Sequence, residues 1–311
     1  MRALVTGCAG FIGSSLSERL LADGHIVSGI DCFTDYYAKS IKESNLAGFR
    51  THPNFAFHEL DLSRDPLGDA VGNAEVIFHL AAYPGLMRSW INFDTYTTHN
   101  LTATHRLLEA VKGRSTLKKF LYASTSSVYG KYASGDENLP TRPSSPYGIT
   151  KLAGEQLARV YQDEFQVPTV VMRFFSVYGP RQRPDMGYHL FIDAVLRGKP
   201  IQLTGDGLQV RGNTYIDDCV EATQRAGFHA NPGEIYNLGG GELTTIIDAI
   251  RQIERISGKK AVIERRPDRA GDQIATAADV GKLYRHLGWK PSTGLTEGLT
   301  RQIERLKSQL E

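Results

Sequence analysis

Over the first half of the chain, short runs of apolar residues alternate with longer stretches in which apolar residues recur every three or four positions. The short runs predict buried strands, and the longer stretches predict amphipathic helices. Because strands separated by helices join through right-handed crossovers, this order predicts a doubly wound α/β fold, a parallel sheet with helices on both faces. The expected strands are 4–6, 25–30, 56–59, 75–80, 119–123 and 169–173, and the expected helices are 11–23, 95–112 and 147–165. An apolar stripe on the last helix is expected at Ile149, Ala153, Leu157, Val160 and Tyr161.

The pattern changes after residue 180. A loop is expected at 179–185, and shorter elements follow it. We expect two domains: a larger one over 1–180, to which the chain returns near 213–240, and a smaller one over 181–311 that closes over the carboxyl edge of the sheet. The later elements are a last strand of the main sheet at 236–238 and helices near 244–256, 278–287 and 295–309.

Composition places the chain among ordinary globular proteins. The 311 residues are 41% hydrophobic and 23% charged, with a formal net charge of +2. These values exclude disorder, collagen-like repeats and coiled coil, and they give no reason to expect nucleic acid or a membrane as partner. The three cysteines, Cys8, Cys32 and Cys219, form no sequence cluster, so we expect a reducing compartment and no metal site. No apolar run is long enough for a membrane span, and the first seven residues lead into a glycine pattern rather than forming a signal peptide, so a cytoplasmic protein is expected.

A glycine-rich segment joins the first expected strand to the first expected helix. Gly7, Gly10 and Gly13 allow a tight turn, close approach of the backbone to a pyrophosphate and close packing of helix on strand, while the helix N-terminus attracts the anion. Asp31 ends the second strand, where a carboxylate accepts hydrogen bonds from the ribose hydroxyls of NAD and repels the 2′-phosphate of NADP. The alternatives are a plain glycine turn and an aspartate that caps the next turn, but the strand–turn–helix context favours a dinucleotide site. The other expected members of this site in the loop are Phe11 and Ile12.

The loops after the third and fourth strands are expected to line the same crevice. Asp61 can accept a hydrogen bond from an adenine amino group. His79 is interpreted as a hydrogen-bonded core histidine rather than as a ligand-binding residue. The remaining expected lining residues are Leu62, Leu80, Ala81 and Ala82.

Tyr147 and Lys151 lie four positions apart on an expected helix and hence on one face of it. A lysine ammonium beside a phenol lowers the phenol's pKa, which is about 10 when unperturbed, so such a tyrosine can act as a base. The hydroxyl-rich run 124–130, which contains Thr125, follows the fifth strand at the edge where open α/β sheets bind ligands. A turn that satisfies its own backbone is the alternative. Two signals at one edge of the sheet favour a catalytic site.

Together, the glycine motif, Asp31, Thr125 and the pair Tyr147 and Lys151 resemble the extended short-chain dehydrogenase/reductases, and among them the NAD-dependent nucleotide-sugar epimerases and dehydratases. The resemblance covers essentially the whole chain. It implies a Rossmann domain with tightly bound NAD that is regenerated in every turnover, and a smaller nucleotide-sugar-binding domain. It also implies that Thr125 and Tyr147 bracket the C4 hydroxyl of the sugar, that Lys151 holds the nicotinamide ribose and polarises Tyr147, and that the two longest expected helices form a four-helix homodimer interface.

The residues after Thr125 distinguish branches of this family. The related 4,6-dehydratases carry Asp-Glu at these two places, an acid and a base that eliminate water. The related UDP-glucuronate decarboxylases carry Glu at the second place. Here the places hold Ser126 and Ser127, which cannot do that work, so C4 epimerisation is the expected chemistry.

Segments 173–180 and 183–186 resemble those of the UDP-glucuronate 4-epimerases. The resemblance therefore implies a UDP-sugar substrate with a C6 carboxylate. Arg183, with hydroxyls from Ser126, Ser127 and Ser176, is expected to bind that carboxylate. The alternative for Arg183 is a solvated arginine in a loop.

The chain departs from the family pattern at two places. The family usually has Thr at Ser176, and Arg-Asp-Phe where this chain has Arg211 followed by Gly-Asn. Arg211 and Arg269 match positions that bind the nucleotide diphosphate, and Asp272 matches a position that binds the nucleotide ribose. Three alternatives stay open: a 4-epimerase of UDP-glucose or UDP-N-acetylglucosamine, a UDP-glucuronate decarboxylase, and a non-catalytic NAD-binding regulator, which has no need of the catalytic residues.

Overall fold

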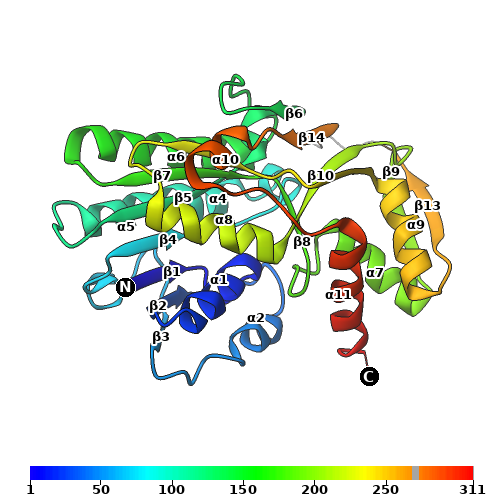
Figure 1. Ribbon diagram of the computed structural model, residues 1–311, viewed down its shortest axis with the longest axis horizontal. Coiled ribbons are helices and arrows are strands. Elements are labelled where there is room, and N and C mark those ends of the chain that lie inside the picture. The colour runs from blue at the N-terminus through cyan, green and yellow to red at the C-terminus, as the bar shows by residue number, and fades with distance from the viewer. Residues whose placement is uncertain (268–272, 311) are drawn as a thin grey trace.

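The main sheet has seven parallel strands in the order β11-β7-β5-β4-β1-β2-β3. The structure is a computed structural model that describes residues 1–267 and 273–310 (Figure 1). The order reverses on either side of β1, so the fold is α/β and doubly wound, as the sequence predicts. Its strands are β1 (Arg2–Thr6), β2 (Ile26–Asp31), β3 (Phe55–Glu59), β4 (Val76–His79), β5 (Lys119–Thr125), β7 (Thr169–Phe174) and β11 (Ile235–Leu238).

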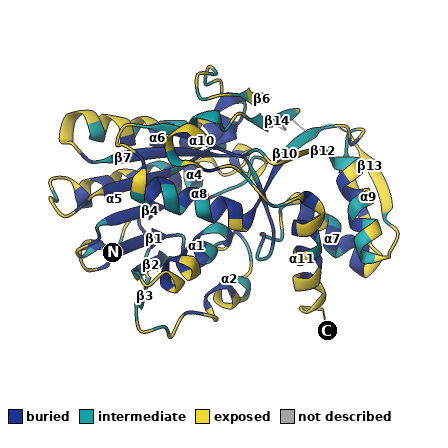
Figure 2. Ribbon diagram, viewed as in Figure 1, coloured by how far each residue is buried: buried dark blue, intermediate teal, exposed yellow. Residues whose placement is uncertain are grey.

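Helices cover both faces of this sheet (Figure 1). Side chains alternate between the faces along each strand: Ala3 and Val5 pack in the core beneath α1 and α8, whereas Leu4 packs beneath α5 and α6. The inner strands β4, β5 and β7 are therefore buried on both sides, as Figure 2 shows, whereas no residue of the edge strand β3 is fully buried. The helices associated with this sheet are α1 (Phe11–Ala22), α2 (Lys39–Leu46), α3 (Gly68–Val71), α5 (Ala103–Val111), α6 (Pro146–Phe165), α8 (Ile216–His229) and α10 (Gly281–Leu287).

The helix expected at 95–112 is built from three consecutive parts: α4 (Phe93–Tyr96), a π-helical segment (Thr97–Thr102) and α5. Asn100 lies in the π-helical segment and is buried. Its side-chain amide accepts a hydrogen bond from the Tyr83 backbone N–H at 2.7 Å and donates to the Thr150 hydroxyl at 3.1 Å. The widened turn thus fastens this helix both to α6 and to the loop after β4, and π-helical turns are frequent near functional sites.

The apolar stripe expected on α6 does not face the sheet. Ile149 and Val160 are 53% and 50% exposed, and of the five expected residues only Tyr161 is buried. The helix turns another face to the sheet because Gly154 packs on Tyr122: a Cβ at Gly154 would lie 2.2 Å from the Tyr122 hydroxyl oxygen. The buried residues of α6 are Gly148, Thr150, Lys151, Gly154, Glu155, Ala158 and Tyr161.

A second lobe holds a five-stranded sheet in which β12, β10, β14 and β6 follow one another and β8 pairs with β10. A separate two-stranded pair and three helices complete this lobe, which lies on the right in Figure 1. Two strands of the lobe, β6 and β8, come from residues before 180. The strands are β6 (Tyr132–Gly135), β8 (Ser176–Tyr178), β9 (Pro200–Thr204), β10 (Val210–Tyr215), β12 (Glu242–Thr245), β13 (Val262–Arg266) and β14 (Ala275–Ala278). The helices are α7 (Gly187–Arg197), α9 (Ile246–Ser257) and α11 (Leu295–Lys307), and two short 3-10 turns elsewhere are Arg88–Trp90 and Ser126–Tyr129.

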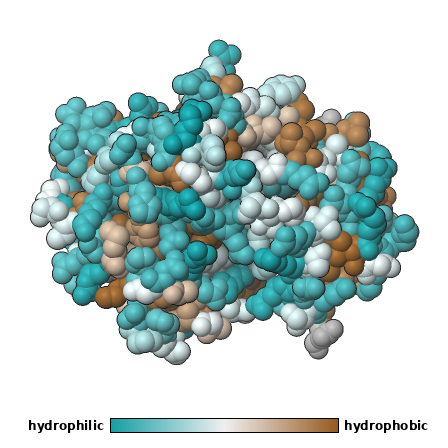
Figure 3. All heavy atoms as spheres, viewed as in Figure 1, coloured by the Kyte–Doolittle hydropathy of each residue, from teal (hydrophilic) through white to brown (hydrophobic). Residues whose placement is uncertain are grey.

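The surface is mainly hydrophilic on the face seen in Figure 3. Hydrophobic side chains gather toward the upper right, where Figure 2 labels β12 and β14. Among the described residues, no helix has both the length and the apolar character that crossing a bilayer requires.

Candidate active site

A pocket of about 350 Å³ lies along the carboxyl ends of β1 to β5, where the strand order reverses. This is the edge at which open α/β sheets bind ligands. The structure gathers in this one pocket every residue that the sequence assigned to the dinucleotide or to catalysis, together with Arg183. These residues are Gly7, Gly10, Phe11, Ile12, Gly13, Asp31, Asp61, Leu62, Leu80, Ala81, Ala82, Thr125, Tyr147 and Lys151.

The glycine turn leaves no room for side chains. Gly7 has φ +71°, and a Cβ there would lie 3.0 Å from the backbone of Ala81. A Cβ at Gly13 would lie 2.1 Å from the carbonyl oxygen of Gly7. Gly10 is the N-cap of α1, so the free N–H groups of the helix N-terminus border the pocket. The turn therefore forms a cradle for an anion such as a pyrophosphate.

Asp31 is fixed at the end of β2. One carboxylate oxygen accepts a hydrogen bond from the Ala9 N–H at 3.2 Å, and the other accepts from the Phe33 N–H at 2.9 Å. The ammonium of Lys42 lies 4.0 Å away, and the Asp31 side chain is 10% exposed. This leaves an oriented carboxylate at the pocket wall, the arrangement expected for binding a ribose.

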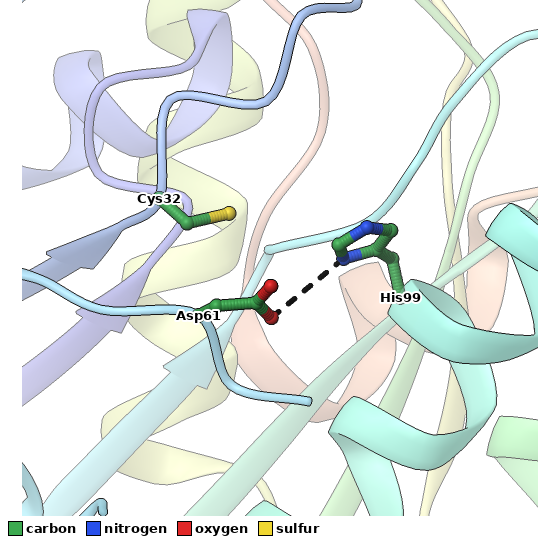
Figure 4. A group of neighbouring side chains, drawn as sticks. All are labelled: Cys32, Asp61 and His99. Atoms are coloured by element: carbon green, nitrogen blue, oxygen red, sulfur yellow. Dashed lines mark ion pairs between the residues drawn. The ribbon is translucent and has the colours of Figure 1, made fainter. Parts of the chain in front are cut away.

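Asp61, Cys32 and His99 meet at the far end of the pocket (Figure 4). Asp61 accepts hydrogen bonds from the backbone N–H and hydroxyl of Ser63 at 2.9 and 2.7 Å, and His99 Nδ1 lies 3.9 Å from the same carboxylate oxygen. Burial favours a raised pKa for Asp61, but the Ser63 hydrogen bonds and the charges of His99 and Arg64 outweigh it and lower that pKa.

The same corner holds the residue types that bind metal ions, because the ligand atoms of Cys32, Asp61 and His99 lie within 4.8 Å of one another. Burial and the carboxylates of Asp31 and Asp61 raise the pKa of Cys32 to about 11, so its sulfur is a protonated thiol at neutral pH. An ionised Asp61 beside a neutral thiol suits a hydrogen-bond donor such as the adenine amino group.

His79 is the core histidine that the sequence predicts. It is 1% exposed, with Nδ1 2.8 Å from the Thr6 hydroxyl and Nε2 2.9 Å from the Thr104 hydroxyl. Because Thr104 donates its own proton to the Asn100 carbonyl at 2.7 Å, it accepts from His79, which places the imidazole proton on Nε2. Burial and the charge of Lys151 lower the pKa of His79 to about 3, so it is neutral and structural.

Thr125, Tyr147 and Lys151 converge where β5 ends and α6 begins. Thr125 ends β5, and its hydroxyl lines the same pocket as the half-buried Tyr147 phenol. Ser145 caps α6 by accepting a hydrogen bond from the Gly148 N–H at 3.1 Å, which fixes the first turn, where Tyr147 lies. A phenol, a hydroxyl and an amine thus share one enclosed wall of the pocket.

The electrostatic pairing of Tyr147 with Lys151 stays a prediction. Burial raises the pKa of Tyr147, and the Arg183 cation and the Thr125 hydroxyl oppose the rise. Lys151 lies over the ring of Tyr122 at 4.4 Å, and burial lowers the pKa of Lys151 to about 7 despite the opposing charge of Glu155. Arg183 is thus a second cation in the pocket that holds Tyr147.

Arg183 is not a solvated loop arginine. Its side chain is 21% exposed, and Nε and Nη2 donate to the two carboxylate oxygens of Asp185 at 2.9 and 3.0 Å. The Tyr36 hydroxyl donates to Asp185 at 3.1 Å. The sequence analysis identified neither Asp185 as the partner of Arg183 nor Tyr36 as the partner of Asp185. Tyr36 follows β2 and is 149 positions from Asp185.

The hydroxyl-bearing residues beside Thr125 are buried, and some of their hydrogen-bonding groups are paired within the protein. The Ser126 hydroxyl donates to the Gln273 side chain at 3.2 Å, and Gln273 donates back to the Ser126 carbonyl at 3.2 Å. Ser127 donates its backbone N–H to the Thr125 hydroxyl oxygen at 3.2 Å. Gln273, which the sequence analysis did not identify, therefore ties this run to the segment that enters β14.

A second pocket of about 1030 Å³ adjoins the first and shares Tyr36 and Met186 with it. Ser176 and Arg211 line this second pocket, whereas Arg183 lines the first. Ser126 and Ser127 are not among the residues that line either pocket. Arg211 donates to the backbone carbonyl of Gln273 at 2.7 Å. Arg269 and Asp272, the other two residues expected there, lie outside the described residues.

A buried ion pair lies behind the catalytic wall. Glu155 on α6 is fully buried, and it accepts hydrogen bonds from Arg173 on β7 at 2.5 and 3.1 Å and from the Ser124 hydroxyl at 2.9 Å. Arg173 also donates to the Tyr129 hydroxyl at 2.8 Å. The sequence signal for this pair is a charged residue inside the otherwise apolar strand 169–173.

Comparison with known proteins gives consistent results. Residues 3–239 match the NAD dependent epimerase/dehydratase family. The chain is 45% identical over 312 residues to the uncharacterized UDP-glucose epimerase YtcB of Bacillus subtilis, covering 99% of this chain and 98% of that protein. It is 38% identical to a UDP-glucuronate 4-epimerase of Thermodesulfobacterium geofontis, covering 99% and 97%. The crystal structure of the UDP-glucuronic acid 4-epimerase from Bacillus cereus, in complex with UDP-glucuronic acid and NAD, matches with a TM-score of 0.96 at 41% identity, covering 100% of both chains.

Proposed function

The chain belongs to the NAD dependent epimerase/dehydratase family, and from that premise we propose that it is a UDP-glucuronate 4-epimerase that forms UDP-galacturonate. One observation carries the choice of a uronate: the Arg183 guanidinium lines the same pocket as Tyr147 and Thr125. The sequence also has serines rather than carboxylates at positions 126 and 127. The similarity of the whole chain to the Bacillus cereus enzyme, whose structure contains UDP-glucuronic acid and NAD, supports the proposal.

The first pocket fits NAD. The glycine cradle and the N-terminus of α1 suit its pyrophosphate, Asp31 its adenosine ribose, and Asp61 its adenine amino group. Lys151 suits the nicotinamide ribose. When bound, NAD supplies a hydride acceptor at C4 of the sugar and returns the hydride later in the same turnover.

Tyr147 moves the proton in this proposal. It takes the proton of the C4 hydroxyl, directly or through Thr125, which lines the same pocket. Arg183 stabilises the phenolate. The 4-keto sugar then turns about its diphosphate linkage and presents its other face, and Tyr147 protonates the C4 oxygen again, so that C4 is inverted.

With a uronate as substrate, the site must also prevent the loss of carbon dioxide. Its 4-keto form is a β-keto acid, which loses carbon dioxide most readily when the C5–C6 bond aligns with the carbonyl π system. We propose that Arg183, Ser126, Ser127 and Ser176 hold the carboxylate away from that alignment. Because the Ser126 hydroxyl donates to Gln273, its share of this work is smaller.

The diphosphate and nucleotide lie in the second pocket in this proposal. Arg211 lines that pocket and is assigned to the diphosphate together with Arg269, and Asp272 is assigned to the nucleotide ribose. These assignments rest on the match to family positions for Arg269 and Asp272.

The test is product analysis. Purified protein is incubated with UDP-glucuronate and, separately, with UDP-glucose, and the products are identified by NMR. UDP-galacturonate from the acid alone supports the proposal, whereas UDP-galactose without UDP-galacturonate refutes it. Tyr147→Phe should abolish turnover while NAD remains bound. Arg183→Ala should yield a UDP-pentose from the acid, and normal epimerisation without pentose would remove the carboxylate role.

A UDP-glucose 4-epimerase is the second candidate. The observation that favours it is the Arg183–Asp185 pair, since a neutralised guanidinium attracts an anionic sugar less than a free one does. The 45% identical relative also carries the name of a UDP-glucose epimerase. The product analysis separates the two candidates.

We further propose a cytoplasmic homodimer. Exposed apolar side chains support it: Ile149, Val160 and Phe165 are half-exposed on α6, Ile91 is exposed just before α4, and Phe93 is exposed at the start of α4. A light-scattering mass of twice that of one chain is expected, and a mass of one chain at micromolar concentration would refute the dimer. The free thiols of the three cysteines suit a reducing compartment.

A further inference from the structure

Arg183 presents only part of its guanidinium to a substrate. Asp185 takes the edge formed by Nε and Nη2, in a bidentate pair. This leaves the edge that carries Nη1 outside the pair. A guanidinium can bind a second carboxylate through that remaining edge, with both hydrogen bonds in its plane.

The partner of Arg183 is itself held. Tyr36 donates its hydroxyl to Asp185 at 3.1 Å and is 7% exposed. The Tyr36 ring packs edge-on against Tyr83 at 5.2 Å, and Arg88 lies over the ring at 4.3 Å while donating to the Tyr36 carbonyl at 3.0 Å. The orientation of Asp185, and with it that of Arg183, is thus fixed by the loop after β2.

The pair lies at the junction of the two pockets. Arg183 lines the first pocket, Asp185 lines the second, and Tyr36 lines both. In the proposed function, the reacting sugar occupies this junction, between the nucleotide and the catalytic wall. The free edge of Arg183 is therefore where the C6 carboxylate arrives.

We propose that Asp185, held by Tyr36, is a positioning residue that fixes the edge of Arg183 offered to the carboxylate and thereby decides between epimerisation and loss of carbon dioxide. This inference rests on the proposed function. A carboxylate held by a fixed edge keeps the C5–C6 bond out of alignment with the C4 carbonyl. If the guanidinium rotates, the C5–C6 bond can break, its electron pair forms the C4–C5 enolate, carbon dioxide leaves, and C5 takes up a proton. C4 is then reduced as in the epimerisation, which gives a UDP-pentose.

The experiment compares Asp185→Asn and Tyr36→Phe with wild type and with a matched control, Asp193→Asn. Asp193 forms an ion pair with Arg197 at 2.6 Å on α7, lies outside both pockets, and is 32% exposed, against 33% for Asp185. The measurement is the ratio of UDP-pentose to UDP-galacturonate formed from UDP-glucuronate. Because both products come from the same folded molecules, this ratio does not change when a variant simply folds less well.

Asp185→Asn should raise that ratio about tenfold, and Tyr36→Phe, which removes one hydrogen bond, about threefold. Asp193→Asn should leave it at the wild-type value. An unchanged ratio in Asp185→Asn, with UDP-galacturonate formed normally by the wild type, overturns the positioning role alone. Wild-type protein that leaves UDP-glucuronate unconverted overturns the proposed function, and the positioning role with it.

Binding gives a second readout that needs no turnover. In NAD-loaded Tyr147→Phe protein, calorimetry compares the affinities for UDP-glucuronate and UDP-glucose. Adding Asp185→Asn removes a negative charge beside Arg183, so the preference for the acid should increase about tenfold. Tighter binding of the acid together with poorer retention of its carboxylate is the combination that a positioning role requires. A preference for the acid that falls or stays constant would contradict it.

Discussion

Glu155→Gln tests the buried ion pair behind the catalytic wall. Glu155 is fully buried and Arg173 is 4% exposed, and two hydrogen bonds of 2.5 and 3.1 Å join them. Removing one partner of such a pair leaves a buried charge without compensation, which costs about 3–5 kcal/mol. The amide of Gln keeps the shape of Glu and one acceptor oxygen, so we expect the lower end, about 3 kcal/mol of the free energy of unfolding.

The assay is urea-induced unfolding of Glu155→Gln, of Arg173→Met and of the double variant, followed by circular dichroism and fluorescence. The double variant should be less destabilised than the sum of the two single variants, because the second substitution removes the stranded charge. A loss of less than about 1 kcal/mol in Glu155→Gln, or additive losses in the double variant, would refute the reasoning that a buried ionic pair is present.

Three further predictions concern single residues of the site. The folded-state pKa of Lys151, about 7, lies below its unfolded value of about 10.4, so the unfolded chain binds one more proton between these pH values. The melting temperature of the NAD-free protein should therefore rise with pH over this range. The rise should be smaller in Lys151→Met, and an identical pH profile of the two proteins would contradict the shifted pKa. Gly154→Ala should lower the free energy of unfolding in urea by about 1–3 kcal/mol, because the new Cβ would lie 2.2 Å from the Tyr122 hydroxyl oxygen. The control Gly187→Ala, in which the atom nearest to the new Cβ is 3.6 Å away, should change it little. Equal losses in the two variants would refute the close-packing argument. Asp31→Asn should reduce the ratio of the affinities for NAD and NADP about tenfold in cofactor titrations, because the repulsion of the 2′-phosphate disappears. An unchanged ratio would show that Asp31 does not set the preference for NAD.

The main sheet could be predicted from sequence because each of its strands is a local apolar run followed by a local turn. The residues assigned to the dinucleotide lie in one pocket, and the glycine motif from Gly7 to Gly13 could be recognised because it is contiguous. The second lobe was predicted less fully. Its strands are short, and they pair across long separations, as β6 does with β14.

The missed site residues Tyr36 and Gln273 depend on partners distant in sequence, whereas Asp185 pairs with Arg183 two positions away. Tyr36 and Asp185 lie 149 positions apart, and no pattern in either segment indicates that they meet. The stripe on α6 was not placed correctly for a different reason. Periodicity finds apolar faces, but α6 buries Lys151 and Glu155 and leaves Ile149 and Val160 exposed. Buried polar positions of this kind break the usual pattern of an amphipathic helix.

The route of the chain between its two sheets has a consequence for its synthesis. β6 and β8 leave the main sheet for the second one, and α8 and β11 return after β10 has been made. A nascent chain that stops at residue 180 lacks the outer strand β11 beside β7 and the helix that covers β4 and β5. Neither lobe is therefore a separate stretch of polypeptide, and a single cut in the chain does not release one from the other. The main sheet can therefore be completed only after α8 and β11 have been synthesised.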